Sequence, residues 1–108
     1  MIDWHHVDDL KQTIGAEAFA EVVVLFLDEA DQAIAQLTSA QTLPGITKEL
    51  HGLKGIALNL GFKELAQVCQ RLELQAEAGV LDLPLEQVNV CYGVSRAEFT
   101  ARLALTAA

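Results

Sequence analysis

The sequence predicts an all-α protein, an up-down-up-down four-helix bundle with a short N-terminal helix that caps one end. Three observations indicate this fold. Apolar residues recur at steps of three and four along four long segments, which is the period of a helix with one buried face. Sustained alternation of apolar and polar residues, the mark of a half-buried strand, is missing. The connections are short, so consecutive helices should pack side by side in opposite directions.

Each expected helix is bounded by turn-forming residues. The helices are expected at about residues 4–14, 16–40, 46–60, 62–77 and 85–105. Gly15 ends the first, and the residues at 42–45 break the chain before the third. Gly61 forms a tight joint, Gly79 ends the fourth, and Pro84 indicates an early helical turn. The first helix should lie over one end of the bundle through an apolar face formed by Trp4, Val7 and Leu10.

Length and composition predict one helical domain over residues 1–108. The chain has 108 residues, of which 52% are hydrophobic, enough to close a core. Its net charge of −8 argues against a sequence-independent nucleic-acid binder and against attraction to an anionic membrane surface. The longest apolar run covers only residues 22–27, whereas a membrane span needs about twenty residues.

The N-terminus and the cysteines indicate a cytoplasmic protein. Residues 1–6 lack the basic start and apolar stretch of a secretory signal. Cys69 and Cys91 fall on inward positions of neighbouring helices, so we expect reduced core thiols, with a redox pair as the less favoured alternative. The start at Met1 and the Ala-rich end fit a free-standing protein, and a domain cut from a larger kinase is the alternative.

His51 should lie on the outer face of the third helix, opposite the apolar stripe. That stripe comprises Ile46, Leu50, Leu53, Ala57 and Leu60. Gly52 and Gly55 occupy interior positions of this helix, where each glycine costs roughly 1 kcal/mol relative to alanine. Helical side chains lean toward the N-terminus, so a side chain at position 55 would cover His51. Glycine there leaves the imidazole open, and the same lean should bring Lys54 toward the ring.

Positive charge gathers around this histidine. Residues 46–63 carry a net charge of +2, from Lys48, Lys54 and Lys63 against the single acid Glu49, although the whole chain carries −8. An open imidazole accompanied by cations suits a group that accepts an anionic phosphoryl group. Spacing and charge alone leave a plain solvated helix face as an equal alternative.

Residues 51–61 resemble the signature of the histidine-containing phosphotransfer (HPt) domain. They read His-Gly-Leu-Lys-Gly-Ile-Ala-Leu-Asn-Leu-Gly. The family signature has His, any residue, Leu, Lys and Gly, then a short spacer and Asn-Leu-Gly or a close variant. The resemblance is firm over residues 46–73 and looser elsewhere. The signature is short but fairly specific, because it fixes His, Lys and Gly at set offsets in a bundle of the right size.

The resemblance implies a histidine phosphotransfer intermediate of a multistep two-component phosphorelay. His51 would accept a phosphoryl group from a receiver-domain aspartate and pass it to another receiver. Lys54 would stabilise the phosphoryl oxygens, and Gly55 would give access to the ring. No Gly-rich nucleotide-binding loop occurs, so a carrier without kinase activity of its own is expected. Whether such a carrier counts as an enzyme is left open.

The implied partners are response-regulator receiver domains, with a hybrid sensor kinase as a further candidate. Docking is expected through Lys48, Leu58 and Ile14. The chain is expected to be a monomer that binds no cofactor or metal, with Mg²⁺ supplied by the receiver. The donor, the acceptor and the output of the pathway stay open.

Three positions depart from the family pattern. Gly52 stands where a helix former is expected, and Leu58 stands where a small residue is expected. Glu73 aligns with a position from which family members place a polar side chain near the histidine. Because an acid would repel a phosphoryl group, the role of Glu73 is left open.

The sequence allows two other functions. A non-catalytic helical adaptor could bind a signalling partner through the same face. A metal or cofactor carrier ranks far behind it. His5 and His6 lie near several aspartates, but adjacent histidines on a helix point about 100° apart and do not readily ligate one ion.

Overall fold

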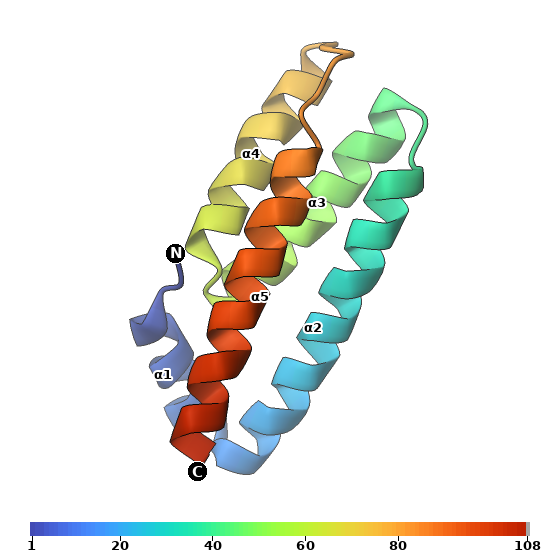
Figure 1. Cartoon of the computed structure of the whole chain (residues 1–108). Coiled ribbons are helices and arrows are strands. Elements are labelled where there is room, and N and C mark those ends of the chain that lie inside the picture. Colours follow the sequence, from blue (N-terminus) through green and yellow to red (C-terminus); the bar gives the residue numbers. More distant parts are fainter. Residues whose placement is uncertain (108) are drawn as a thin grey trace.

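The computed structural model describes residues 1–107, which form five helices joined by short connections (Figure 1). The helices are α1 (Trp4–Ile14), α2 (Ala16–Ser39), α3 (Leu43–Leu60), α4 (Lys63–Glu77) and α5 (Glu86–Ala107). The long helices α2 to α5 run alternately up and down along a body of 45 × 20 × 19 Å. The predicted all-α bundle is confirmed.

The apolar stripes of the four long helices meet in one core. The largest fully buried side chains include Phe62, Phe99, Leu50 and Leu53. Phe62 and Phe99 meet edge to face with their ring centroids 5.2 Å apart, a favoured arrangement for aromatic rings. Leu50 and Leu53 lie on α3 on either side of His51, so their burial fixes the direction in which that histidine points.

Helix α1 covers the lower end of the bundle, as its apolar face predicts. Val7 is buried, and Trp4 stacks on Phe99 with a centroid separation of 5.7 Å. The backbone N–H of Asp3 donates to the Gly61 carbonyl over 2.7 Å. A Cβ at Gly61 would lie 2.9 Å from the Asp3 carbonyl oxygen, and φ there is +75°. Glycine is therefore required where α1 meets the α3–α4 joint.

The boundaries of α3 and α4 differ from the expected ones at two places. Helix α3 begins at Leu43 rather than Ile46, because the Thr42 side chain caps it by accepting from Gly45 N–H over 3.1 Å. Pro44 fits within this first turn, where no intrahelical donor is needed. Phe62 precedes α4 instead of beginning it, and its ring is fully buried.

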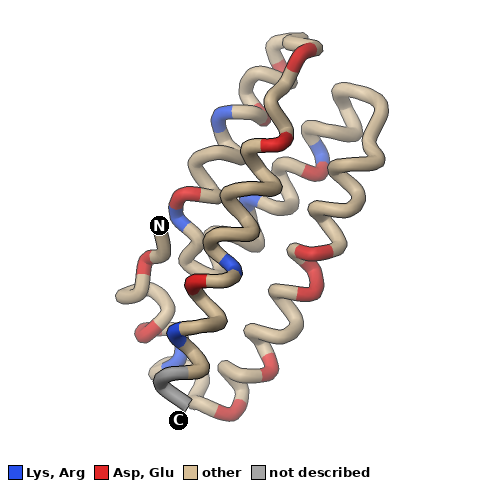
Figure 2. Tube along the Cα trace, viewed as in Figure 1, with Lys and Arg blue, Asp and Glu red and all other residues tan. Residues whose placement is uncertain are grey.

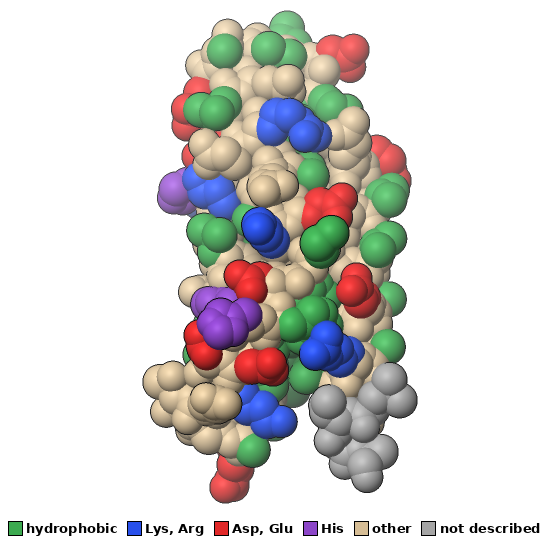
Figure 3. All heavy atoms as spheres, turned by 90° about the vertical axis from the view of Figure 1, so that its left-hand side faces the viewer, with side chains coloured by type: hydrophobic (Ala, Val, Ile, Leu, Met, Phe, Trp, Pro, Cys, Tyr) green, Lys and Arg blue, Asp and Glu red, His purple; other side chains and the backbone are tan. Residues whose placement is uncertain are grey.

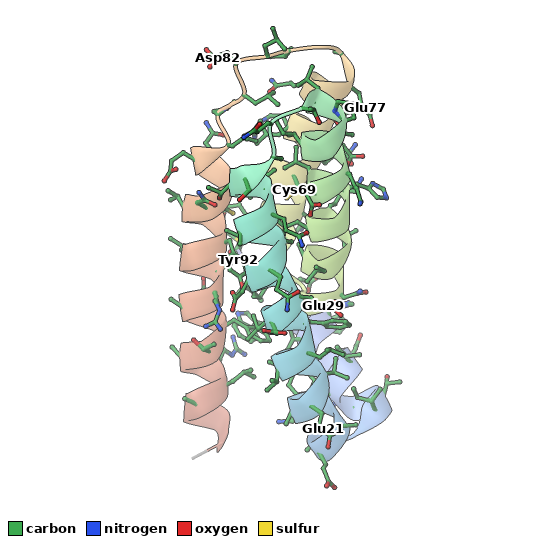
Figure 4. The ribbon with its side chains drawn as sticks, turned by 90° about the vertical axis from the view of Figure 1, so that its right-hand side faces the viewer. Glu21, Glu29, Cys69, Glu77, Asp82 and Tyr92 are labelled. Carbon is green, nitrogen blue, oxygen red and sulfur yellow. The ribbon has the colours of Figure 1, made fainter. Side chains whose placement is uncertain are left out.

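Charge is unevenly distributed over the helices. Helix α2 contains acidic but no basic residues, as Figure 2 shows. One of its acids, Asp31, accepts a hydrogen bond from the Tyr92 hydroxyl and pairs with Arg96 at 3.3 Å. Figure 4 shows Tyr92 reaching from α5 toward α2, so this polar cluster joins the two helices.

Candidate functional site

His51 lies in the middle of α3 with its side chain 69% exposed. Its neighbours Leu50 and Leu53 are fully buried, so the imidazole points away from the core as predicted. The exposure is one-sided, because Nδ1 lies 3.1 Å from Oε2 of Glu73 on the neighbouring helix α4. One ring edge therefore faces α4 and the other faces solvent.

Glu73 is the one buried charged residue in the part of the chain that the structure describes. Burial by itself would raise the pKa of this carboxyl. The Lys54 ammonium and the His51 ring favour its ionised form more strongly, and the net effect holds the pKa below its ordinary value. Glu73 is therefore a carboxylate at neutral pH. Because a carboxylate only accepts hydrogen bonds, it fixes which ring nitrogen of His51 carries the proton.

Lys54 contacts polar side chains of the neighbouring helix α4. Its Nζ extends across to α4, where it lies 2.7 Å from Oε1 of Gln70 and 3.1 Å from Oε1 of Glu73. Lys54 and His51 thus contact opposite oxygens of one carboxylate. The Lys54 side chain is only 21% exposed, and its ammonium neutralises Glu73. Lys54 and the His51 ring are therefore joined through this shared carboxylate on α4, which the helical lean alone does not include.

These contacts leave Nε2 of His51 as the outward-facing nitrogen. In the neutral ring the proton sits on Nδ1, where it can be donated to Glu73, and the lone pair then lies on Nε2. A lone pair on an exposed, fixed ring nitrogen is a nucleophile. Helices α3 and α4 supply both members of the pair, so their close packing positions it.

The glycines beside His51 face open space. A Cβ at Gly52 or Gly55 would meet no atom within 4 Å. Internal packing therefore requires glycine at neither position. The surface at Gly55 is therefore open, as the expected access to the ring requires.

The residues expected at a docking surface lie in different surroundings. Lys48 lines a hollow of about 690 Å³ beside His51, together with Glu73 and Glu77. Leu58 is 57% exposed two turns further along α3. Ile14, the last residue of α1, is 36% exposed. It lines neither the hollow beside His51 nor the groove that contains Leu58.

Among the described residues, the other chemically reactive side chains form no second centre. The ring Nε2 of His6 bonds the Asn59 carbonyl oxygen at 2.9 Å, and His5 pairs with Asp9 at 3.4 Å. The described residues contain no group of three or more His, Cys, Asp or Glu side chains that could hold a metal ion. Cys69 and Cys91 are free thiols, and burial raises the pKa of Cys69 to about 12.

Comparison with known proteins identifies the family. A model of the Hpt domain matches residues 21–107, which include four of the five helices almost completely. The chain belongs to the Hpt domain family. Hpt domains carry out histidine phosphotransfer in two-component signalling and interact with the receiver domains of response regulators. No curated protein and no solved structure matches the chain. Among the described residues, no helix of this Hpt domain is long and apolar enough to cross a membrane.

Proposed function

We propose that this Hpt domain is an intermediate of a multistep phosphorelay in which His51 carries the phosphoryl group. The observation that carries the proposal is the fixed orientation of His51. Its Nδ1 is held 3.1 Å from a buried carboxylate, and the side chain is 69% exposed. The nucleophilic nitrogen Nε2 is therefore presented to a partner without a conformational change.

Transfer to this domain would proceed by attack of the Nε2 lone pair on the phosphorus of a receiver phosphoaspartate. The N–P bond forms as the P–O bond breaks, and the aspartate carboxylate leaves with the electron pair. The proton on Nδ1 stays in place, hydrogen-bonded to Glu73. The reverse displacement, with a second receiver aspartate as nucleophile, would pass the group on. Such transfers depend chiefly on positioning and on neutralisation of charge.

Glu73 would act as the positioning residue for His51. It fixes the ring proton on Nδ1, and it stabilises the positive charge that the ring gains when Nε2 is phosphorylated. The objection that an acid repels a phosphoryl group is met by Lys54, whose ammonium lies 3.1 Å from the carboxylate and neutralises it. Lys54 would in addition stabilise phosphoryl oxygens once the group arrives.

The remaining residues of the site would admit and hold the partner. Gly55 would leave space over the ring, and exposed Leu58 would contact the receiver. Lys48 and Ile14 are further candidate contacts, Lys48 at the hollow beside His51 and Ile14 at the end of α1. The described side chains offer no carboxylate cluster suited to Mg²⁺. The ion that assists transfer would accordingly be bound by the receiver.

A receiver labelled with radioactive phosphate on its aspartate tests the proposal. After mixing, the label should appear on the Hpt domain in a form that is labile to acid and stable to base, and a second receiver should remove it. The His51→Ala variant should accept none, whereas His5→Ala should behave as wild type. If the domain binds phosphorylated and unphosphorylated receivers equally tightly and accepts no phosphate, it is an adaptor instead.

A further inference from the structure

Helix α5 is apolar on two opposite faces. Its inner face packs in the core through Val88, Tyr92 and Phe99, which are buried. Its outer face carries Val90 and Val94, whose side chains are 59% and 63% exposed. Figure 1 shows α5 at the front of the bundle, and Figure 3 shows green hydrophobic side chains spaced along the right-hand edge that this helix forms. Core packing accounts for the inner face only.

The apolar residues of the outer face have the spacing of a helix–helix seam. Apolar residues that alternate between steps of three and four keep one stripe of a helix facing a partner helix, as in coiled coils. At 100° per residue, the members of this stripe lie within about 60° of one another. Steps of four, three and four residues separate the exposed side chains of Val90, Val94, Ala97 and Ala101.

The outer stripe of α5 is uncharged over about four helical turns. Arg96 and Glu98 are the charged residues between positions 87 and 101, and both lie beside the stripe. Arg96 points to α2, where it pairs with Asp31 at 3.3 Å. Glu98 follows Cys91 by seven residues and so lies on the same side as this cysteine, which lines the groove toward α4. A second protein surface can therefore cover the stripe without burying a charge.

Gly93 lies at the edge of the stripe, in the interior of α5. Glycine is unfavourable in a helix interior relative to alanine. A Cβ at this position would meet no atom within 4 Å, so packing within the chain does not require glycine. The missing side chain does allow another helix to approach the backbone of α5 closely.

Charge complementarity favours a second copy of this chain as the occupant of the stripe. Arg71 of α4 lies level with Gln87 of α5, because its Nη2 donates to Oε1 of Gln87 over 2.7 Å. If two α5 helices pack antiparallel with Val90 of one copy opposite Val94 of the other, Glu98 comes within one residue of the level of Gln87 in the other copy. Glu98 then faces Arg71 across the interface, and two-fold symmetry forms the pair twice.

We infer that two copies of this Hpt domain associate through the outer face of α5. Helix α3 packs chiefly on α2 and α4, and α5 packs on the same two helices. The outer face of α5 therefore points away from α3 and from His51, and both histidines stay open in the dimer. Two partners could then be served at once. The inference does not depend on the proposed function, and it differs from the monomer expected from the sequence.

Sedimentation equilibrium of the full chain tests the association. One helix from each copy forms a small interface of the weakly associating kind, for which a dissociation constant of about 0.1 mM is expected. Measurements should extend to about 1 mM, where such a dimer predominates. The seam variant is Val94→Glu, and its matched control is Val24→Glu, at a valine of α2 that is 69% exposed.

Val94→Glu should raise the dissociation constant more than about tenfold, because it places like charges in the seam, whereas Val24→Glu should stay within about twofold. Arg71→Glu and Glu98→Arg should each weaken the dimer at least about threefold, and the double variant should restore it. Labelling of His51 by phosphoramidate, a small phosphoryl donor, should proceed at the wild-type rate in Val94→Glu. Amide chemical shifts that change with protein concentration should lie on α5 and the adjoining edge of α4.

A wild-type chain that stays monomeric at about 1 mM would overturn the inference. Equal effects of Val94→Glu and Val24→Glu would also overturn it, as would a double variant that associates no better than its single parents. Concentration-dependent shifts confined to α3 would place the contact on the wrong face. Shift changes along α5 on adding a receiver to the monomeric chain would assign the stripe to a different protein and refute the second copy.

Discussion

Replacing Glu73 by glutamine tests how the carboxylate acts on His51. Glu73→Gln keeps the shape and one acceptor oxygen but removes the charge, so Nδ1 retains a neutral hydrogen bond. Hydrogen bonds to charged groups contribute about 1.5–3 kcal/mol and neutral ones about 0.5–1.5 kcal/mol. The substitution should therefore destabilise the positively charged ring by the difference, about 1–1.5 kcal/mol. Since about 1.4 kcal/mol corresponds to a factor of ten, labelling and transfer should slow about tenfold.

The assay measures the rate at which phosphoramidate labels His51 and the rate of transfer from a phosphorylated receiver, with Glu77→Gln as the control. Glu77 is an exposed carboxylate lining the same hollow, four residues further along α4. It should change both rates by less than about twofold. The substitution at position 73 also frees Lys54 to move toward the phosphoryl group. Unchanged or faster rates in Glu73→Gln would therefore refute the positioning role and show that the carboxylate hinders transfer.

Three further predictions concern access, packing and protonation. Gly55→Leu should melt near the wild-type temperature, because its side chain enters open space, but it should accept phosphate from a receiver more slowly; wild-type transfer would contradict the access role. Tyr92→Phe should lower the free energy of unfolding by about 1 kcal/mol in urea titrations, through loss of the hydrogen bond to Asp31, and transfer should be unchanged. Because the pKa of Cys69 is raised from 9.0 to about 12, the folded state retains a proton that the unfolded state loses. Stability should therefore fall as the pH rises above about 9, and less so in Cys69→Ala; equal alkaline slopes would exclude this cause.

The bundle could be predicted because burial of one apolar stripe dominates the packing of each long helix. The apolar stripe of α3 placed Leu50 and Leu53 inward, and that geometry alone turned His51 outward. Helix periodicity says less about the ends of a helix. The segment at 42–45 looked like a break because Pro44 and Gly45 disfavour helix interiors. Capping by Thr42 instead lets both residues form the first turn.

The site could be predicted only in part, because its key contacts join two helices. The resemblance aligned Glu73 with a position near the histidine, but the sequence left the role of this acid open. Which groups would pair with it depends on how closely α3 and α4 pack. The contact of Lys54 with Glu73 could not be predicted for the same reason, since the lean of a side chain on its own helix does not include a carboxylate on the next helix.

The most direct test of the account is to identify the phosphorylated atom by nitrogen-15 and phosphorus-31 NMR after treatment with phosphoramidate. The account predicts a phosphoryl group on Nε2 of His51, with the Nδ1 proton still bonded to Glu73, and no such signal in His51→Ala. A phosphoryl group on Nδ1 of His51, or on His5 or His6 at comparable rates, would contradict it.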